Sequence, residues 1–220
     1  MNISNNKLRL YGIAGILGGL LLFAGDMLFY YHPVNTDLKI NMGNASDMRL
    51  LLSTITALFA TWLLLLGTIQ VYYAFIKSSA VARNTVTACF IAIFISYGII
   101  HGAYLSIATS SKLALNNGLD IDKAIYLSVY INNILRLFVY PFFAVLSIVF
   151  IYQVWKKNTL YPRWIIIFFP LIPFLFRGLL DANLSGKYWI IFVGGFYNLI
   201  LVLFFIASTL ALWNYKQEAV

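Results

Sequence analysis

The sequence predicts an all-α, polytopic membrane protein with six transmembrane helices and no soluble domain. Its 220 residues are 62% hydrophobic and 10% charged, and the mean hydropathy is +0.86, whereas soluble domains are about 45–50% apolar and about 25% charged. Apolar runs long enough for a helix to cross a bilayer, roughly 20 residues each, recur along the chain. Segments such as FFAVLSIVFIY are apolar throughout, which disfavours the alternating strands of an outer-membrane barrel.

The first apolar run follows the basic residues Lys7 and Arg9, as the apolar part of a signal peptide does. The run is too long for a signal peptide and lacks a small-x-small cleavage site, so we expect it to remain as an anchor. In the fourth span Pro141 is expected to bend the helix and to free a carbonyl group. The six spans are expected at 10–31, 49–76, 84–110, 124–155, 163–181 and 188–213. The loops between them are short, so residues 1–220 are predicted to form a single helical bundle.

Basic residues are concentrated in alternate loops. The N-terminus, the second and fourth loops and the C-terminal tail hold eight Lys or Arg against one Glu, whereas the other three loops hold five Lys or Arg and five Asp. Because cytoplasmic loops retain Lys and Arg, we expect both termini in the cytoplasm and place the chain in the cell (inner or plasma) membrane. The net charge of +8 then reflects topology, so membrane lipids and no nucleic acid are the expected partners.

Polar side chains within the predicted spans lie toward the external side. Charged groups in hydrocarbon are costly and usually face protein or a water-filled cavity. The inner halves of the spans hold little beyond Gln70 and Ser or Thr. The outer halves hold Asp26, His101, Asn132, Asn133, Arg136 and Arg177, with Asn198 nearer the middle of the last span.

Helical spacing predicts that these side chains face one another, because residues three, four or seven apart share a helix face. Asp26 shares a stripe with Gly15 and Gly19, whose small-xxx-small spacing lets helices approach closely. Gly98 and Gly102 are expected to do the same in the third span. The other stripes carry Tyr97, His101 and Tyr104; Ser128, Asn132, Arg136 and Tyr140; and Gly194 and Asn198. We therefore expect one outward-opening polar chamber between the first, third, fourth and sixth spans.

Structural roles are an alternative for each of these residues. Asp26 could form a buried ion pair with Arg136 or Arg177 that only orients helices. His101 could be a hydrogen-bonded packing residue. Arg177 and Asp181 are four apart near the surface, which favours an interfacial pair. The segment YPRW at 161–164 is typical of an interfacial anchor, with a proline in the first helical turn.

Several familiar chemistries are not supported by the sequence. It has no HExxH or cysteine-type metal spacing, and Cys89 is its only cysteine, so no metal and no cofactor are expected. Nucleophile-elbow, Walker and Rossmann glycine patterns are absent. No lysine lies deep in a span, which removes a retinal Schiff base.

Four short motifs carry a resemblance. Gly25 and Asp26 at the end of the first span, His101 in the third, YPRW at 161–164, and Gly195 with Asn198 in the last span resemble an uncharacterised family of small six-span bacterial integral membrane proteins. The resemblance covers most of the chain and implies a topology, but no activity. Arg177 and Asp181 depart from the plainer residues expected in that region.

The leading hypothesis is that the chamber binds a small or lipid-like, possibly anionic ligand for transport or sensing. Arg136 and Arg177 would attract negative charge. Five polar neighbours would complete the ligand-binding site: Asn132, Asn133, Asn198, Tyr97 and Tyr104. One alternative is an intramembrane enzyme that acts on a lipid or isoprenoid with His101 and Asp26 as an acid–base pair. A second is a structural or assembly role, and a homo-oligomer is compatible with all three.

Overall fold

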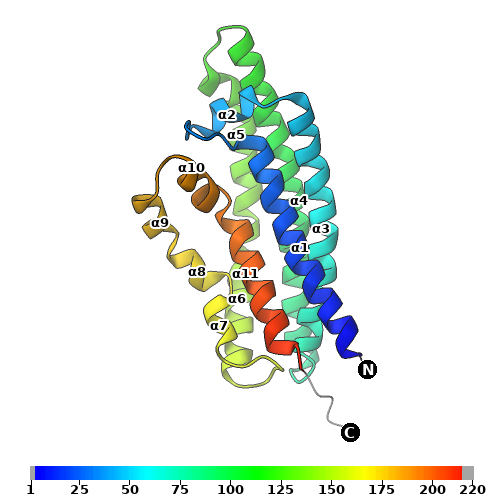
Figure 1. Ribbon diagram of the computed structural model, residues 1–220. Coiled ribbons are helices and arrows are strands. Elements are labelled where there is room, and N and C mark those ends of the chain that lie inside the picture. The colour runs from blue at the N-terminus through cyan, green and yellow to red at the C-terminus, as the bar shows by residue number, and fades with distance from the viewer. Residues whose placement is uncertain (1–2, 215–220) are drawn as a thin grey trace.

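The computed structural model describes residues 3–214, and every regular element in this part of the chain is a helix (Figure 1). The elements in chain order are α1 (Asn5–Tyr30), α2 (Leu38–Asn44), α3 (Asp47–Ala74), α4 (Ala80–Asn116), α5 (Ile121–Leu137), α6 (Val139–Trp155), α7 (Ile165–Phe168), α8 (Leu171–Leu175), α9 (Arg177–Asn183), α10 (Gly186–Trp189), the π-helix η1 (Ile190–Gly194) and α11 (Phe196–Leu212). The all-α prediction is confirmed for these residues.

Side-chain caps fix where the long helices begin. The hydroxyl groups of Ser4, Ser46 and Ser79 accept hydrogen bonds from backbone N–H groups three residues later, and the Asp120 carboxylate does the same at the start of α5. Such side chains satisfy N–H groups that the helix itself leaves unpaired. The helices α3, α4 and α5 therefore begin a few residues before the apolar runs that predicted them.

Among residues 3–214, four stretches are long and apolar enough to cross a membrane: α1, α3, α4 and the run through α5 and α6 from Ile121 to Trp155. A fifth is the pair Gly186–Gly194 and Phe196–Leu212, which is bent by 58°. The α5–α6 run is interrupted at Phe138, three residues before Pro141. Pro141 lacks the N–H that would bond to the carbonyl of residue 137, which explains the interruption; the bend expected there stays a prediction.

The predicted span at 163–181 is not one continuous helix. It consists of the short helices α7, α8 and α9, with Phe169 in an extended conformation between α7 and α8 (φ −65°, ψ 134°). Phe169 precedes Pro170, and the residue before a proline is driven away from the helical region. Pro173 removes a second N–H donor. These two prolines explain why an apolar run of sufficient length fails to form a single helix.

Helix α1 packs against α3 and α11, as Figure 1 shows. A Cβ atom added at Gly15 would lie 2.4 Å from the Phe205 ring of α11, and one at Gly19 would lie 2.7 Å from Val202 of the same helix. The predicted close approach along the glycine stripe is confirmed. On α4 the prediction of close packing holds for Gly98, which faces Thr61. It is wrong for Gly102, because a Cβ atom added there would meet nothing within 4 Å.

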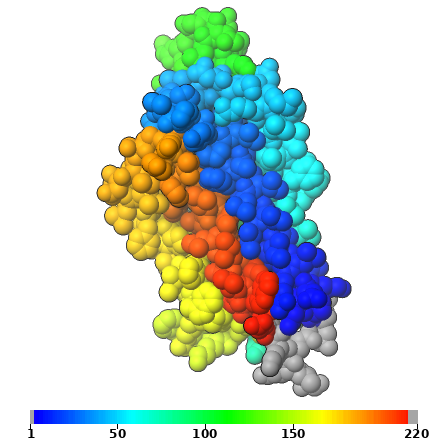
Figure 2. All heavy atoms as spheres, in the orientation of Figure 1, coloured from blue at the N-terminus to red at the C-terminus, as the bar shows by residue number. Residues whose placement is uncertain are grey.

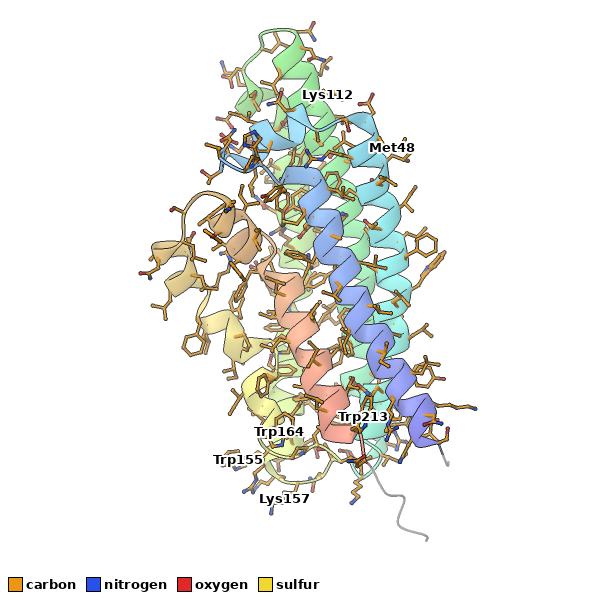
Figure 3. The ribbon with its side chains drawn as sticks, in the orientation of Figure 1. Met48, Lys112, Trp155, Lys157, Trp164 and Trp213 are labelled. Carbon is orange, nitrogen blue, oxygen red and sulfur yellow. The ribbon has the colours of Figure 1, made fainter. Side chains whose placement is uncertain are left out.

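Both described chain ends lie at the same end of the bundle (Figure 1). The Arg9 guanidinium donates two hydrogen bonds, of 3.0 and 2.7 Å, to the carbonyl oxygen of Trp213. Figure 3 shows Trp155, Trp164 and Trp213 at this end together with Lys157. Indole rings and basic side chains are typical of the level at which a membrane meets water.

A buried polar network joins three elements near the same end. Ser208 Oγ donates to Gln70 Oε1 at 2.7 Å and so accepts from the Tyr161 hydroxyl, also 2.7 Å away. Gln70 Nε2 donates to the Leu8 carbonyl at 3.1 Å. Tyr161 is only 3% exposed, so its predicted role as an interfacial anchor is wrong. Arg163 and Trp164 of the same motif are exposed.

The opposite end is formed by the α4–α5 hairpin, which makes the top of the molecule in Figure 2. Helix α4 has 37 residues, and a rise of about 1.5 Å per residue makes it about 55 Å long, more than a hydrocarbon core of about 30 Å requires. The Lys112 ammonium pairs with Asp47, and Lys39 pairs with Asp122 at 2.6 Å. These contacts tie the hairpin to α2 and α3.

Candidate ligand-binding cavity

A cavity of about 310 Å³ lies inside the bundle, between α1, α4, α5, α6, the broken segment α8–α9, η1 and α11. Its volume is at the lower end of the range of about 300–1,000 Å³ that is usual for small-molecule sites. The predicted site residues that line it are Asp26, Tyr97, His101, Tyr104, Arg136, Arg177 and Asn198. Asn132 is buried behind the wall, and Asn133 is exposed.

Asp26 and His101 form the centre of the polar wall. Asp26 Oδ1 lies 3.1 Å from His101 Nδ1, and Asp26 Oδ2 accepts a hydrogen bond of 2.7 Å from the Asn198 side-chain amide. The His101 side chain is 4% exposed and that of Asp26 is 15% exposed. Three helices, α1, α4 and α11, therefore meet at one carboxylate.

Ser53 of α3 holds the other ring nitrogen of His101. Its Oγ lies 2.7 Å from the carbonyl oxygen of Gly25, which can only accept, so the hydroxyl proton is donated there. Ser53 Oγ must then accept from His101 Nε2, 3.0 Å away, and Nε2 carries a proton. Nδ1 lies 3.1 Å from Asp26 Oδ1. A hydrogen bond across this contact needs a proton on one of the two atoms, and such a pair would have no net charge.

Gly25 permits this arrangement because it has no side chain. A Cβ atom at this position would lie 2.8 Å from Thr56 Oγ1 and 3.2 Å from Cε1 and Nε2 of His101. Such distances require the ring to move away from the helix. The absence of a side chain at Gly25 thus lets His101 and Ser53 reach the α1 backbone.

Ser53, His101 and Asp26 lie in the order of a serine-hydrolase triad, but Ser53 is not placed to act as a nucleophile. It is 0% exposed, and it is not among the residues that line the cavity. Its proton is donated to the Gly25 carbonyl, so His101 cannot accept it as a general base must. The role that this geometry supports for Ser53 is to orient the imidazole ring.

Arg136 is held by neutral partners. Its Nε donates to Asn132 Oδ1 at 3.0 Å, and its Nη2 donates to the Tyr104 hydroxyl. Asn132 in turn donates to the carbonyl oxygen of Ile100 at 3.1 Å. Asn132 therefore orients the guanidinium from behind the cavity wall and does not itself face the cavity.

Arg177 faces the cavity from the broken segment. Its guanidinium carbon lies 5.8 Å from the centroid of the Tyr197 ring, a cation–π distance, and its buried Nε has no hydrogen-bond partner among the described residues. The predicted pair with Asp181 is wrong, because Asp181 accepts a hydrogen bond of 2.7 Å from Trp189 Nε1 instead. Trp189 competes for this carboxylate because α10 folds back beside α9 (Figure 1).

The charges that face the cavity do not cancel. In the described part of the chain, neither Arg136 nor Arg177 forms an ion pair with a carboxylate. The structural alternative in which Asp26 pairs with one of these arginines is therefore wrong, since Asp26 pairs with His101. The cavity wall carries two guanidinium groups, and its Asp26 carboxylate contacts His101 rather than either arginine.

The model of a family of unknown function, DUF6796, matches residues 1–216. The chain belongs to this family. No curated protein and no solved structure matches it. Membership confirms the resemblance noted in the sequence, and three of the four motifs that carried it converge in space. Gly25 with Asp26, His101 and Asn198 meet at one point of the cavity wall, whereas the motif at 161–164 lies near the other end.

Sequence reasoning missed two residues that position the site in this family member. Ser53 is one of many Ser and Thr residues in the spans. The only signal for it was its helical spacing from Ala57 and Ala60, which places it on the small-residue face of α3 that packs against protein. Arg49 was counted as a loop residue. It donates to the carbonyl oxygens of Leu28 (3.0 Å), Met27 (3.2 Å) and Tyr31 (3.2 Å), so it caps the end of α1 that carries Asp26.

The described residues offer no group of three or more His, Cys, Asp or Glu side chains that could hold a metal ion. What the cavity offers chemically is a pair of cationic donors, hydroxyl and amide groups, and a carboxylate in contact with an imidazole.

Proposed function

We propose that this chain binds an anionic, lipid-like ligand in the cavity, for transport or sensing. The observation that carries the proposal is that Arg136 and Arg177 line one cavity without a carboxylate partner, while the Asp26 carboxylate contacts His101 and Asn198 instead. A guanidinium group away from water is costly unless it is paired. An anionic group bound between the two arginines would supply that pairing through charge-assisted hydrogen bonds.

Native mass spectrometry of the detergent-purified chain tests this proposal. We expect an anionic molecule to copurify with the wild type and to be lost from the Arg136→Gln and Arg177→Gln variants. Arg163→Gln is the matched control, because Arg163 is exposed and donates to the Trp155 carbonyl at the far end of the bundle. Retention of the same mass by both cavity variants would rule out the arginines as its binding site.

A second candidate function is an intramembrane enzyme that acts on a lipid or isoprenoid. The observation that favours it is the Asp26–His101 contact of 3.1 Å, which lines the cavity and holds a proton that could be exchanged with a bound molecule. Turnover of an added isoprenyl phosphate, followed by chromatography, should stop in both Asp26→Asn and His101→Gln. Turnover that persists in both variants would remove this candidate.

The bundle also supports a six-pass topology in the plasma membrane. Because the two described chain ends lie together, as the Arg9–Trp213 contact shows, the chain crosses the bundle an even number of times. Five spans cannot satisfy that parity, so we count α7–α9 as a sixth, broken pass. The basic loops then lie on the cytoplasmic side with both termini, and the polar end of the cavity opens outward.

Thiol labelling of intact cells tests this topology in a Cys89→Ser background. A membrane-impermeant maleimide should label Asn117→Cys, at the exposed α4–α5 turn, without permeabilisation. It should label Lys77→Cys, at the exposed α3–α4 turn, only after permeabilisation. The reverse pattern would invert the proposed orientation.

A further inference from the structure

The cavity changes in character along its length. On α4 the polar side chains Tyr97, His101 and Tyr104 line the part nearer the α4–α5 hairpin, whereas Phe90 and Phe94 line the part nearer the chain ends. A rise of about 1.5 Å per residue places about 21 Å along the helix axis between positions 90 and 104. The cavity is therefore elongated along the bundle, and the charged groups and histidine that line it lie toward the hairpin end.

Other elements repeat this order although the chain reverses direction from one to the next (Figure 1). Each contributes a polar residue toward the hairpin and an apolar residue toward the chain ends. These pairs are Asp26 and Leu22 on α1, Arg136 and Leu146 on α5–α6, and Arg177 and Phe174 on α8–α9. Because elements of opposite direction agree, the polarity belongs to the cavity as a whole and not to one amphipathic helix.

We propose that the ligand is an amphiphile with an anionic head group and a single apolar chain. The head group lies between Arg136 and Arg177, and the chain extends past Phe94 toward Phe90 and Leu146. This inference rests on the proposed function and adds the class and orientation of the ligand. The apolar end of the cavity indicates a ligand with an apolar chain, which the two arginines alone do not. A small hydrophilic anion would leave the space beside the phenylalanine rings unfilled.

The volume suits a ligand with one chain. A cavity of about 310 Å³ is at the lower limit for drug-sized molecules, so we assign one apolar chain to the part of the ligand inside it. Single-chain phosphates and carboxylates share the required chemistry. A lysophospholipid, an isoprenyl phosphate and a fatty acid are three sources of it.

Photo-crosslinking tests the orientation without any variant. The full-length chain is reconstituted in nanodiscs of phosphatidylcholine with a dodecyl phosphate probe that carries a diazirine at the end of its chain. We expect labelled peptides that contain residues 90–94 and 143–146. Unmodified dodecyl phosphate should displace this label, and dodecyltrimethylammonium should not, because its head group repels the two guanidinium groups.

A variant on α6 adds a matched comparison. Leu146→Trp places bulk at the apolar end of the cavity, whereas Ile148→Trp places the same side chain on a face that is 70% exposed in the described structure. Displaceable labelling should fall at least severalfold in Leu146→Trp and stay at the wild-type level in Ile148→Trp. Size-exclusion chromatography establishes that both variants fold.

The outcomes separate this inference from the proposed function. Displaceable label found only near Tyr104 and Arg136 would overturn the orientation. Binding of ethyl phosphate as tight as that of dodecyl phosphate would overturn the single-chain ligand while the anionic site stands. No binding of either phosphate, with Leu146→Trp equal to wild type, would overturn both proposals.

Discussion

At the residue scale, His101 is fixed through both ring nitrogens. Nε2 contacts Ser53 and Nδ1 contacts Asp26, so the ring has one orientation. A proton between Nδ1 and Asp26 Oδ1 would leave the pair without net charge. In the proposed site, an anion beside Arg136 and Arg177 would then not be repelled by this carboxylate.

Replacing Asp26 tests the neutrality of the pair. Asp26→Asn leaves a neutral imidazole and a neutral amide, so the affinity for dodecyl phosphate should change by less than about threefold, since the net charge of the wall is unchanged. Titration calorimetry in detergent measures this affinity. If Asp26 were instead a free carboxylate beside a neutral ring, its removal would strengthen anion binding by about tenfold or more.

Two glycines beside His101 provide a matched pair of substitutions. Gly25→Ala would force the His101 ring and Thr56 to move, since its Cβ would lie 3.2 and 2.8 Å from them. Such overpacking costs about 1–3 kcal/mol of the free energy of unfolding. Gly102→Ala meets nothing within 4 Å and should leave the thermal midpoint of the detergent-solubilised chain unchanged. Equal midpoints for the two variants would contradict the described contact.

At the element scale, the contact of α1 with α11 depends on the absence of side chains. A Cβ at Gly15 would lie 2.4–2.6 Å from atoms of the Phe205 ring. Gly15→Ala should therefore lower stability by about 1–3 kcal/mol, and the added change Phe205→Leu should recover part of the loss. Unfolding monitored by tryptophan fluorescence measures both. Leu17→Ala, on the exposed face of α1, is the control; no difference between it and Gly15→Ala would contradict this packing.

The sequence predicted the long elements well because composition and length decide them. Apolar runs around α1, α3, α4 and α5–α6 have no competing structure in a membrane, where only helices or closed barrels satisfy the backbone. The break at 163–181 was missed because hydropathy does not register backbone geometry, which Pro170 and Pro173 determine. The π-helix at Ile190–Gly194 was also missed, because hydropathy does not register backbone geometry. Its last residue, Gly194, accepts a hydrogen bond of 3.0 Å from the Tyr30 hydroxyl.

The sequence predicted the depth of the site residues in their spans and the helix faces that carry them, but not which side chains contact one another. Helical spacing indicated that Asp26, His101, Arg136 and Asn198 face inward, and all four line the cavity. It could not indicate which of them touch, because spacing fixes the phase of one helix and says nothing about the rotation of its neighbour. The ion pair between Asp26 and an arginine was therefore a reasonable but wrong alternative.

At the scale of the whole molecule, the buried network around Gln70 and the polar cluster around Asp26 and His101 lie in different parts of the bundle. The network of Gln70, Ser208 and Tyr161 joins α3, α11 and the segment before α7, and none of these three residues lines the ligand cavity. Burial raises the pKa of the Tyr161 phenol, so it stays protonated and donates to Ser208. We expect this network to contribute to stability and not to the proposed binding of a ligand.

Replacing Gln70 tests this separation. Gln70→Leu leaves the Ser208 hydroxyl and the Leu8 carbonyl without their partner, which costs about 1–3 kcal/mol. The thermal midpoint should fall, while the affinity for dodecyl phosphate should remain that of the wild type. A loss of affinity in a folded Gln70→Leu protein would show that the two clusters are coupled.

The most direct measurement of the central claim is the affinity of the full-length chain for dodecyl phosphate after removal of each cavity arginine. Arg136→Gln and Arg177→Gln should each weaken binding by about tenfold or more, because a charge-assisted hydrogen bond contributes about 1.5–3 kcal/mol. Arg163→Gln should bind as the wild type does. Equal affinities for all four proteins would contradict an anion site between Arg136 and Arg177.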